Sequence, residues 1–170
     1  HQQIGQVHTA AMLAQMLAEA GDPGEALRVL RDTRSANPKV GAVLFAELLA
    51  STGELAEADA VLVNLVREYP RSRDLVKLLA KVRIEGGERG AAIQALESSL
   101  GHTCSTPGKC GYQAPDAELL RTLAILHLEE GADVKRGLEV AAMAMNAGAG
   151  NSWEDAYLDA LMARAERLPE

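Results

Sequence analysis

The sequence predicts an all-α array of antiparallel helix pairs, and three observations indicate this fold class. A glycine followed by an acidic residue, with an alanine five residues after the glycine, recurs at Gly21, Gly53 and Gly87. Apolar residues on both sides of each glycine follow the three-and-four spacing of one-sided helices. The chain is 48% hydrophobic but has only one Phe, one Trp and three Tyr, so its core must consist mainly of Leu, Ala, Val and Met. A repeat of roughly 33 residues is typical of helix pairs that bury their apolar faces against neighbouring pairs.

The first expected unit, residues 7–38, contains two helices separated by Gly21. Only glycine takes the left-handed backbone of a helix end without a steric penalty. Asp22 is expected to cap the second helix, and Pro23 suits its first turn. The second helix should end before Pro38, because the residue preceding proline avoids helical geometry. The apolar residues of the first helix that are expected to face inward are Ala10, Leu13, Met16 and Leu17.

The second and third expected units, residues 39–72 and 73–101, repeat this pattern. Gly53 separates the helices of the second unit, and Pro70 closes it. Gly87 separates the helices of the third unit, which has no closing proline. Both units therefore have the same predicted helix–turn–helix plan as the first.

The fourth expected unit, residues 116–149, follows a polar stretch at residues 101–114. This stretch, interpreted as a loop insertion, accounts for the longer interval between Gly87 and Gly131, and it preserves the register of the repeat. We therefore expect one domain of about four repeats that spans residues 1–170.

A last helix is predicted at residues 152–168. Ser152, with Asp155 three residues later, approximates the capping box that starts many helices. Arrays need such an amphipathic end, because the final pair would otherwise leave its apolar side exposed. The residues of this helix expected to lie on the last pair are Trp153, Tyr157, Leu158 and Leu161.

Charge and motifs exclude several classes of function. A formal net charge of −7, without a basic stripe, disfavours a nucleic-acid partner. No apolar run approaches the roughly 20 residues of a membrane span. The sequence contains no phosphate-binding glycine loop, metal-ligand His-Glu helix pair or nucleophile elbow. His127, flanked by Leu126 and Leu128, is expected to pack in the core or groove. We therefore expect no enzymatic activity, no catalytic residues and no cofactor.

The insertion carries the only two cysteines, Cys104 and Cys110, on either side of Pro107-Gly108. Pro-Gly is a strong turn signal, so the chain can double back and bring the two thiols within disulfide distance. Free thiols and a metal site with His102 are the alternatives, although five residues between the cysteines exceed the usual zinc spacing and no fourth ligand is evident. A disulfide would favour an extracytoplasmic location such as a bacterial periplasm, and reduced thiols would favour the cytoplasm.

The pattern resembles the tetratricopeptide repeat (TPR) family over nearly the whole chain. Four pairs of a large and then a small residue fit its close packing of helices: Leu13-Ala14, Phe45-Ala46, Leu79-Ala80 and Leu123-Ala124. The small residues early in the second helices also match its pattern: Ala26, Ala58 and Ala92. Two prolines, Pro38 and Pro70, fit its closing position. The departures are the absent third proline, the insertion, and Gly137 where alanine is usual.

The resemblance implies a right-handed superhelix, an α-solenoid whose first helices line a concave groove that binds an extended or helical segment of a partner protein. The groove positions by this likeness are His8, Ala11, Gln15, Val43, Glu47, Ala50, Asp74, Lys77, Lys81, Ile84, Glu118, Arg121, Ile125 and Leu128. Members that hold a terminal carboxylate of chaperones use Lys and Asn in the first unit. Ala11 and Gln15 stand at those places here, which argues against that activity.

Lys77, Lys81 and Arg121 form a possible cationic centre on successive first helices. It would favour an acidic stretch of a partner through charge-assisted hydrogen bonds, with Arg121 suited to a bidentate carboxylate contact. The alternative is that these are solvated charges balanced by nearby acids: Glu47, Asp74 and Glu85.

The sequence thus predicts a non-enzymatic scaffold or adaptor for another protein. Two alternatives stay open. The Cys104–Cys110 segment could make the domain a redox- or metal-responsive regulatory module, or the repeats could be part of a larger enzyme or secretion apparatus.

Overall fold

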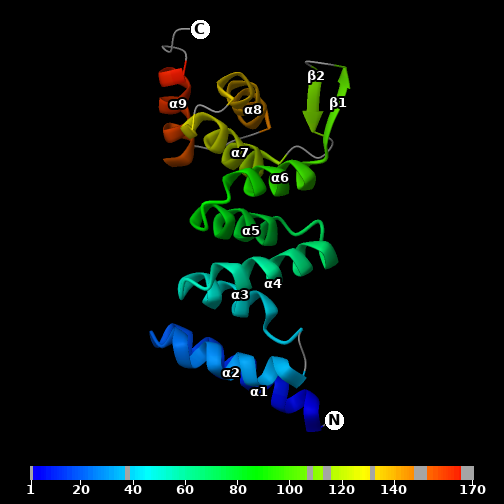
Figure 1. The fold of residues 1–170 in the computed structure, drawn as a ribbon, viewed down its shortest axis with the longest axis vertical. Helices are drawn as coiled ribbons and strands as arrows, with labels where there is room; N and C mark the ends of the chain where they lie inside the picture. Colours follow the sequence, from blue (N-terminus) through cyan, green and yellow to red (C-terminus); the bar gives the residue numbers. More distant parts are fainter. Residues whose placement is uncertain are drawn as a thin grey trace. The chain divides into compact units, whose positions relative to one another are not determined.

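The computed structural model of the chain describes residues 2–36, 39–106, 109–112, 116–130, 133–147 and 153–165. Within these residues helices dominate, and several pairs of neighbouring helices pack closely together, as the all-α repeat prediction requires (Figure 1). The chain divides into two compact units, His1–Glu88 and Arg89–Glu170. No helix among the described residues combines the length and apolarity needed to cross a membrane.

The first unit consists of five helices in the described residues. Each helix packs against the next one along the chain, and the two first helices α3 and α5 also contact each other. Their bounds are α1 Gln2–Glu19, α2 Pro23–Ala36, α3 Ala42–Ser51, α4 Leu55–Glu68 and α5 Arg73–Glu85.

The second unit contains four helices and a β-hairpin in the described residues. Helix α6 packs on α7, α7 packs closely on α8, and α9 packs on both α7 and α8. The bounds are α6 Arg89–Leu100, β1 His102–Thr106, β2 Lys109–Tyr112, α7 Ala117–Glu130, α8 Val134–Asn146 and α9 Trp153–Ala165.

The predicted turn glycines end helices as expected. Gly21, Gly53 and Gly87 have φ angles of +88°, +84° and +77°. In each turn the residue after the glycine donates its backbone N–H to the carbonyl five residues earlier, which satisfies a carbonyl at the helix end. The three acceptors are Leu17, Leu49 and Arg83. The recurring glycine is therefore confirmed as the residue that ends the first helix of each of these repeats.

Helix starts and stops agree with most local signals. The carboxylate of Asp22 accepts the backbone N–H of Glu25 at 3.0 Å, so the predicted cap of α2 is confirmed. Helix α2 ends at Ala36, before Pro38, whereas α1 begins at Gln2 and not near residue 7. A further cap, which the repeat pattern does not predict, is Asp133, whose carboxylate accepts the N–H of Arg136 at 2.9 Å. Gly131 and the Ser152 cap lie outside the described residues.

The large–small pairs reveal one error in the predicted core. The small members Ala14, Ala46, Ala80 and Ala124 are buried in all four repeats. The large members Phe45, Leu79 and Leu123 are also buried, at 4%, 3% and 0% exposure, but Leu13 is 46% exposed. Met16, also expected to face inward, is exposed as well.

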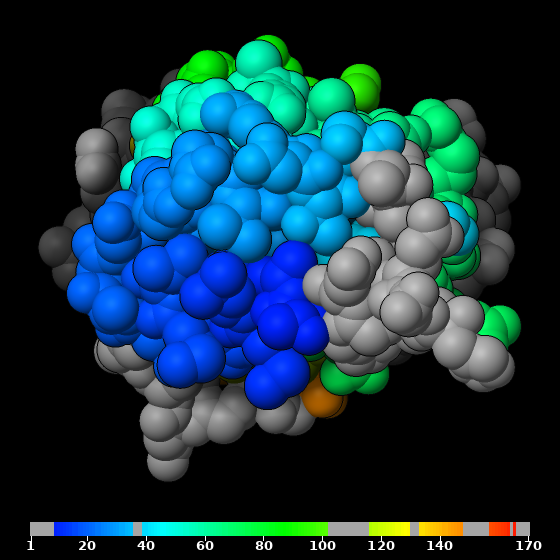
Figure 2. All heavy atoms as spheres, turned by 90° about the horizontal axis from the view of Figure 1, so that it is seen from below, coloured from blue at the N-terminus to red at the C-terminus, as the bar shows by residue number. Residues whose placement is uncertain are grey.

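The exposed side of α1 has a simple cause. The other first helices follow a preceding helix pair, and no described helix covers the corresponding side of α1. Figure 2, seen from below the view of Figure 1, shows residues of the first repeat, in blue, at the surface. Periodicity identified an apolar face here, but it could not show whether another helix lies against that face.

The insertion forms an antiparallel hairpin and not an irregular loop. Strand β1 pairs with β2, and the register opposes Cys104 to Cys110. The expected doubling back of the chain is therefore observed, while Pro107 and Gly108 themselves lie outside the described residues.

Candidate protein-binding surface

The first helices of the first unit leave a row of groove positions accessible. On α3, the apolar positions Phe45 and Leu49 are buried, whereas Val43 and Glu47, one helical turn apart, are exposed. On α5, Lys81 is exposed and Lys77 is half-buried one turn before it. Residues four apart lie on the same helix face. Each helix therefore buries one face and presents the other.

The two exposed faces belong to neighbouring helices. Val43 and Lys77 occupy one repeat position, Glu47 and Lys81 occupy the next one along, and α3 contacts α5. The half-buried Ala50 and Ile84 share a third position. We call the set Val43, Glu47, Ala50, Lys77, Lys81 and Ile84 the α3/α5 face.

The charge of this face is carried mainly by the two lysines. The ammonium of Lys81 is 3.9 Å from the carboxylate of Glu85, and their side chains are 68% and 44% exposed. An exposed pair at this distance contributes little to stability, because solvent screens it and the side chains keep their freedom. The Lys81 ammonium can therefore exchange this weak contact for a carboxylate of a partner at little cost.

Helix α1 contributes polar and small residues to the predicted groove positions. Gln15 is exposed, and its amide donates to Glu19 at 3.1 Å, while Ala11 is half-buried. The side chain of His8 lies outside the described residues. Of the groove residues predicted on α1, Gln15 alone therefore presents a described exposed polar side chain.

The groove residues predicted in the second unit differ from this pattern. Arg121 and Leu128 on α7 are each only 8% exposed, and Ile125 is half-buried. Leu128 lies against Gly137 of α8, so it belongs to the packing of that helix pair. Arg121 is correspondingly a poor candidate for an exposed bidentate contact, and its proximity to Lys77 and Lys81 stays a prediction.

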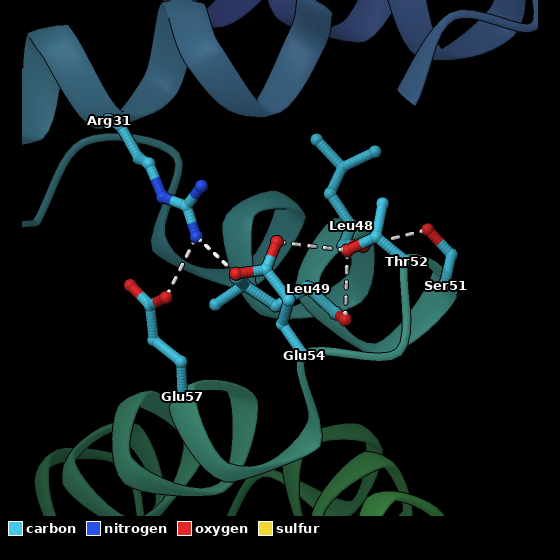
Figure 3. Close-up of polar contacts among 7 residues, drawn as sticks. All are labelled: Arg31, Leu48, Leu49, Ser51, Thr52, Glu54 and Glu57. Carbon is cyan, nitrogen blue, oxygen red and sulfur yellow. Dashed lines mark hydrogen bonds and ion pairs between the residues drawn. The ribbon is translucent and has the colours of Figure 1, made fainter. Parts of the chain in front are cut away.

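The charged side chains of the second helices include ion pairs that connect neighbouring repeats. Arg31 of α2 reaches the carboxylates of Glu54 and Glu57 at 2.5 and 2.9 Å, and these hydrogen bonds raise the pKa of Arg31 (Figure 3). The hydroxyl of Thr52, beside them, donates to the carbonyl of Leu48 at 3.0 Å. Arg31 thus bridges the first and second repeats.

A more buried pair connects the second and third repeats. Nε of Arg83 on α5 donates to the Asp59 carboxylate on α4 at 2.6 Å. Their side chains are 17% and 30% exposed, so this pair is screened less than the surface pairs. It fixes α5, and with it the two lysines of the α3/α5 face, against α4.

His127 has the surroundings of a core residue. It is 8% exposed, and in the described part of the chain its Nε2 has no hydrogen-bond partner. Burial lowers the pKa of His127 below 6.5, against the opposing effect of the Glu97 and Asp133 charges. The described side chains bring together no cluster of three or more His, Cys, Asp or Glu residues that could hold a metal ion.

Comparison with known proteins agrees with this architecture. A family model for tetratricopeptide repeats matches residues 17–82. No curated protein matches the sequence. Solved structures do resemble it. A tetratricopeptide repeat protein from Parabacteroides merdae has a TM-score of 0.75 at 13% identity, over 95% of this chain and 60% of that one.

Two structures of MamA are also similar. MamA from Desulfovibrio magneticus RS-1, from its residue 41 onward, has a TM-score of 0.70 at 17% identity, covering 95% of this chain and 86% of that one. MamA AMB-1 has a TM-score of 0.67 at 16% identity, covering 89% of this chain and 78% of that one. The chain spans less than two thirds of the Parabacteroides protein, and at these identities the likenesses establish the fold. Together they show that residues 17–82 match the tetratricopeptide repeat family and that the chain has the fold of tetratricopeptide repeat proteins.

Proposed function

We propose that the protein is a non-enzymatic interaction scaffold, and that the α3/α5 face binds an acidic segment of a partner protein. The observation that carries this proposal is the contrast on α3 and α5. Each helix buries its core positions but leaves a second face, at equivalent repeat positions, accessible to solvent. A solenoid needs only its packing faces for stability, so a second face with both apolar and charged groups is available for a partner.

The chemistry of the face favours carboxylates in the partner. Lys77 and Lys81 are one turn apart on α5, which matches acidic side chains spaced by one turn or by two extended residues. Glu47 on the neighbouring helix would repel an acid placed over it, so the acidic part of the segment should lie over α5. The chain as a whole has a formal net charge of −7, so surfaces away from the two lysines would repel acidic ligands.

The apolar members of the face would supply the remaining affinity. Val43 is exposed, and Ala50 and Ile84 are half-buried, which gives a shallow surface for small aliphatic side chains. The expected partner is therefore a short amphipathic segment with acids on one side and small apolar residues on the other. The absence of large exposed aromatic side chains on this face fits a reversible interaction.

A peptide titration tests this proposal. The probe is a fluorescein-labelled amphipathic peptide of Leu, Ala and Glu with Glu pairs four residues apart, and its counterpart has Lys in place of every Glu. We expect the acidic peptide to bind with an anisotropy change that weakens with salt. The variant Lys77→Glu/Lys81→Glu should lose about tenfold in affinity. At each of the two positions an attraction of a few tenths of a kcal/mol is replaced by a repulsion of similar size, and the four contributions add up to about 1.4 kcal/mol.

A matched variant controls for net charge. Arg71→Glu/Lys135→Glu makes the same change in charge at two exposed residues outside the face, and it should keep most of the affinity. Equal weakening in both double variants would reduce the interaction to a long-range charge effect and refute the site. Tighter binding of the Lys peptide would refute the acidic partner.

A further inference from the structure

The hairpin between α6 and α7 places the two cysteines opposite each other. Three residue pairs define its register: His102 with Tyr112, Thr103 with Gly111, and Cys104 with Cys110. Directly opposed residues of an antiparallel pair have Cα atoms about 4.5–5.5 Å apart and share one face of the ribbon. A disulfide spans Cα separations of about 4.4–6.8 Å. The backbone register therefore satisfies the distance requirement of a disulfide.

A shift in the strand pairing next to the turn sets the register of the two cysteines. The pairing shifts between Cys104 and Thr106, where the strand carries an irregularity of the β-bulge kind, and Thr106 then pairs with Lys109. A bulge leaves one residue without an opposite partner and fixes the alignment on its far side. Without that shift, Cys104 would not oppose Cys110. The irregularity thus aligns the only two cysteines of the chain.

The sequence around the pair also favours thiol chemistry. His102 lies two residues before Cys104 on β1, and alternate residues of a strand share a face. Lys109 directly precedes Cys110. Cationic neighbours stabilise a thiolate, which is the form that attacks a disulfide. The hairpin therefore combines the spacing for a disulfide with basic residues that are close in sequence to both cysteines.

We propose that Cys104 and Cys110 are a reversible dithiol–disulfide pair that closes by exchange with a small-molecule disulfide such as oxidised glutathione. One cysteine thiolate attacks the glutathione disulfide, forming a mixed disulfide and releasing one glutathione thiolate. The second cysteine then attacks the mixed disulfide at the protein sulfur and releases the second glutathione. The protein loses two hydrogens as protons and two electrons, and these reduce oxidised glutathione to two glutathione molecules.

This assignment is independent of the proposed partner site. The bond would close residues 104–110 into a ring within the connection between α6 and α7, and it would hold β1 against β2. Its state can be measured without any partner. If Cys104 and Cys110 do not form a disulfide, the proposed binding site on the α3/α5 face is unaffected. If the α3/α5 face does not bind a partner, the proposed disulfide is likewise unaffected.

The test is an equilibrium titration of the full chain in glutathione buffers of stepwise ratio, followed by acid quenching, alkylation and mass measurement. We expect a single transition from a doubly alkylated form to an unalkylated form, whose mass is two hydrogens below that of the reduced, unalkylated chain. Trypsin provides the assignment, because it cuts after Lys109, between the cysteines. The oxidised protein should then yield residues 90–109 and 110–121 as one disulfide-linked species, which reductant separates.

A register variant provides the matched control. Thr103→Cys/Cys104→Ser moves one thiol by a single residue, opposite Gly111 and onto the other face of the ribbon. Its equilibrium constant for closure should fall at least about tenfold, which corresponds to a shift of roughly 30 mV. Far-UV circular dichroism checks that the helices of the variant are retained.

Three results would overturn the proposal. The first is thiols that stay alkylatable in fully oxidised glutathione. The second is a register variant that closes as readily as the natural chain, which would mean that the strand register plays no part. The third is a zinc ion that co-purifies with the protein and protects both thiols from oxidation until a chelator removes it.

Discussion

Gly137 of α8 lies directly against Leu128 of α7. A Cβ atom at position 137 would be 2.7 Å from both Cγ and Cδ2 of Leu128, and 3.2 Å from the Cβ of His127. This contact explains why glycine stands where related repeats usually have alanine. The side chain of Leu128 fills the space that the methyl group of alanine would need, so α7 and α8 approach more closely than an alanine would permit.

Gly137→Ala should therefore destabilise the second unit. Alanine favours a helix by about 1 kcal/mol over glycine, but overpacking a buried contact costs about 1–3 kcal/mol. We expect a net loss, visible as a lower urea midpoint in circular dichroism. Gly90→Ala is the control, because no atom lies within 4 Å of its added Cβ, and α6 should be unaffected or slightly stabilised. A stabilised Gly137→Ala variant would contradict the contact.

Equivalent leucines of different repeats should respond differently to truncation. Leu79→Ala removes a fully packed side chain and should cost about 2–5 kcal/mol, as core truncations do. Leu13→Ala, at the same repeat position on α1, should cost less than about 1 kcal/mol, because its side chain is half exposed. Chemical denaturation of the two variants measures the difference. Equal losses would show that α1 is covered in solution.

The Arg83–Asp59 pair should contribute to the docking of α5 on α4. Arg83→Met keeps the aliphatic part of the side chain but leaves the partly buried Asp59 carboxylate without this donor. The expected loss is about 1–3 kcal/mol, between the values for surface and buried pairs. A double-mutant cycle with Asp59→Asn isolates the interaction. Strictly additive losses would indicate that the two side chains act separately.

The buried His127 should make stability depend on pH. Because burial lowers the pKa of His127 in the folded state, the unfolded chain binds a proton more readily below its pKa of about 6.5. The contribution of neutral His127 is therefore complete above pH 6.5 and decreases as the pH falls toward the lowered pKa of the folded state. Urea unfolding at pH 7.5 and 5.5 should show a larger loss for the natural chain than for His127→Leu. An identical loss in both would place the titrating groups elsewhere.

The sequence predicted the repeat well because its signals are local. A glycine at the end of a helix, an Asp cap and a following proline restrict the backbone wherever they occur, and Gly21, Asp22 and Gly53 behaved accordingly. The predicted small residues of the second helices are fully buried: Ala26, Ala58 and Ala92.

The errors concern contacts between elements. Leu13 has the periodicity of a core residue, yet periodicity does not reveal whether a helix covers it. The repeat position of Leu128 predicts a groove residue, and only the missing side chain of Gly137 indicates that α8 comes close enough to bury it. The hairpin had a usable signal, because Thr and Tyr flank a Pro-Gly turn, but the polar composition suggested a loop.

The most direct measurement of the central claim is an amide chemical-shift map of the 18.0 kDa chain titrated with the acidic peptide. The account predicts saturable shifts concentrated at Val43, Glu47, Lys77 and Lys81, with little change on α2 and α4. They should disappear in Lys77→Glu/Lys81→Glu. Shifts centred on Arg31, Glu54 and Glu57, or no saturable shift at all, would contradict a binding surface on α3 and α5.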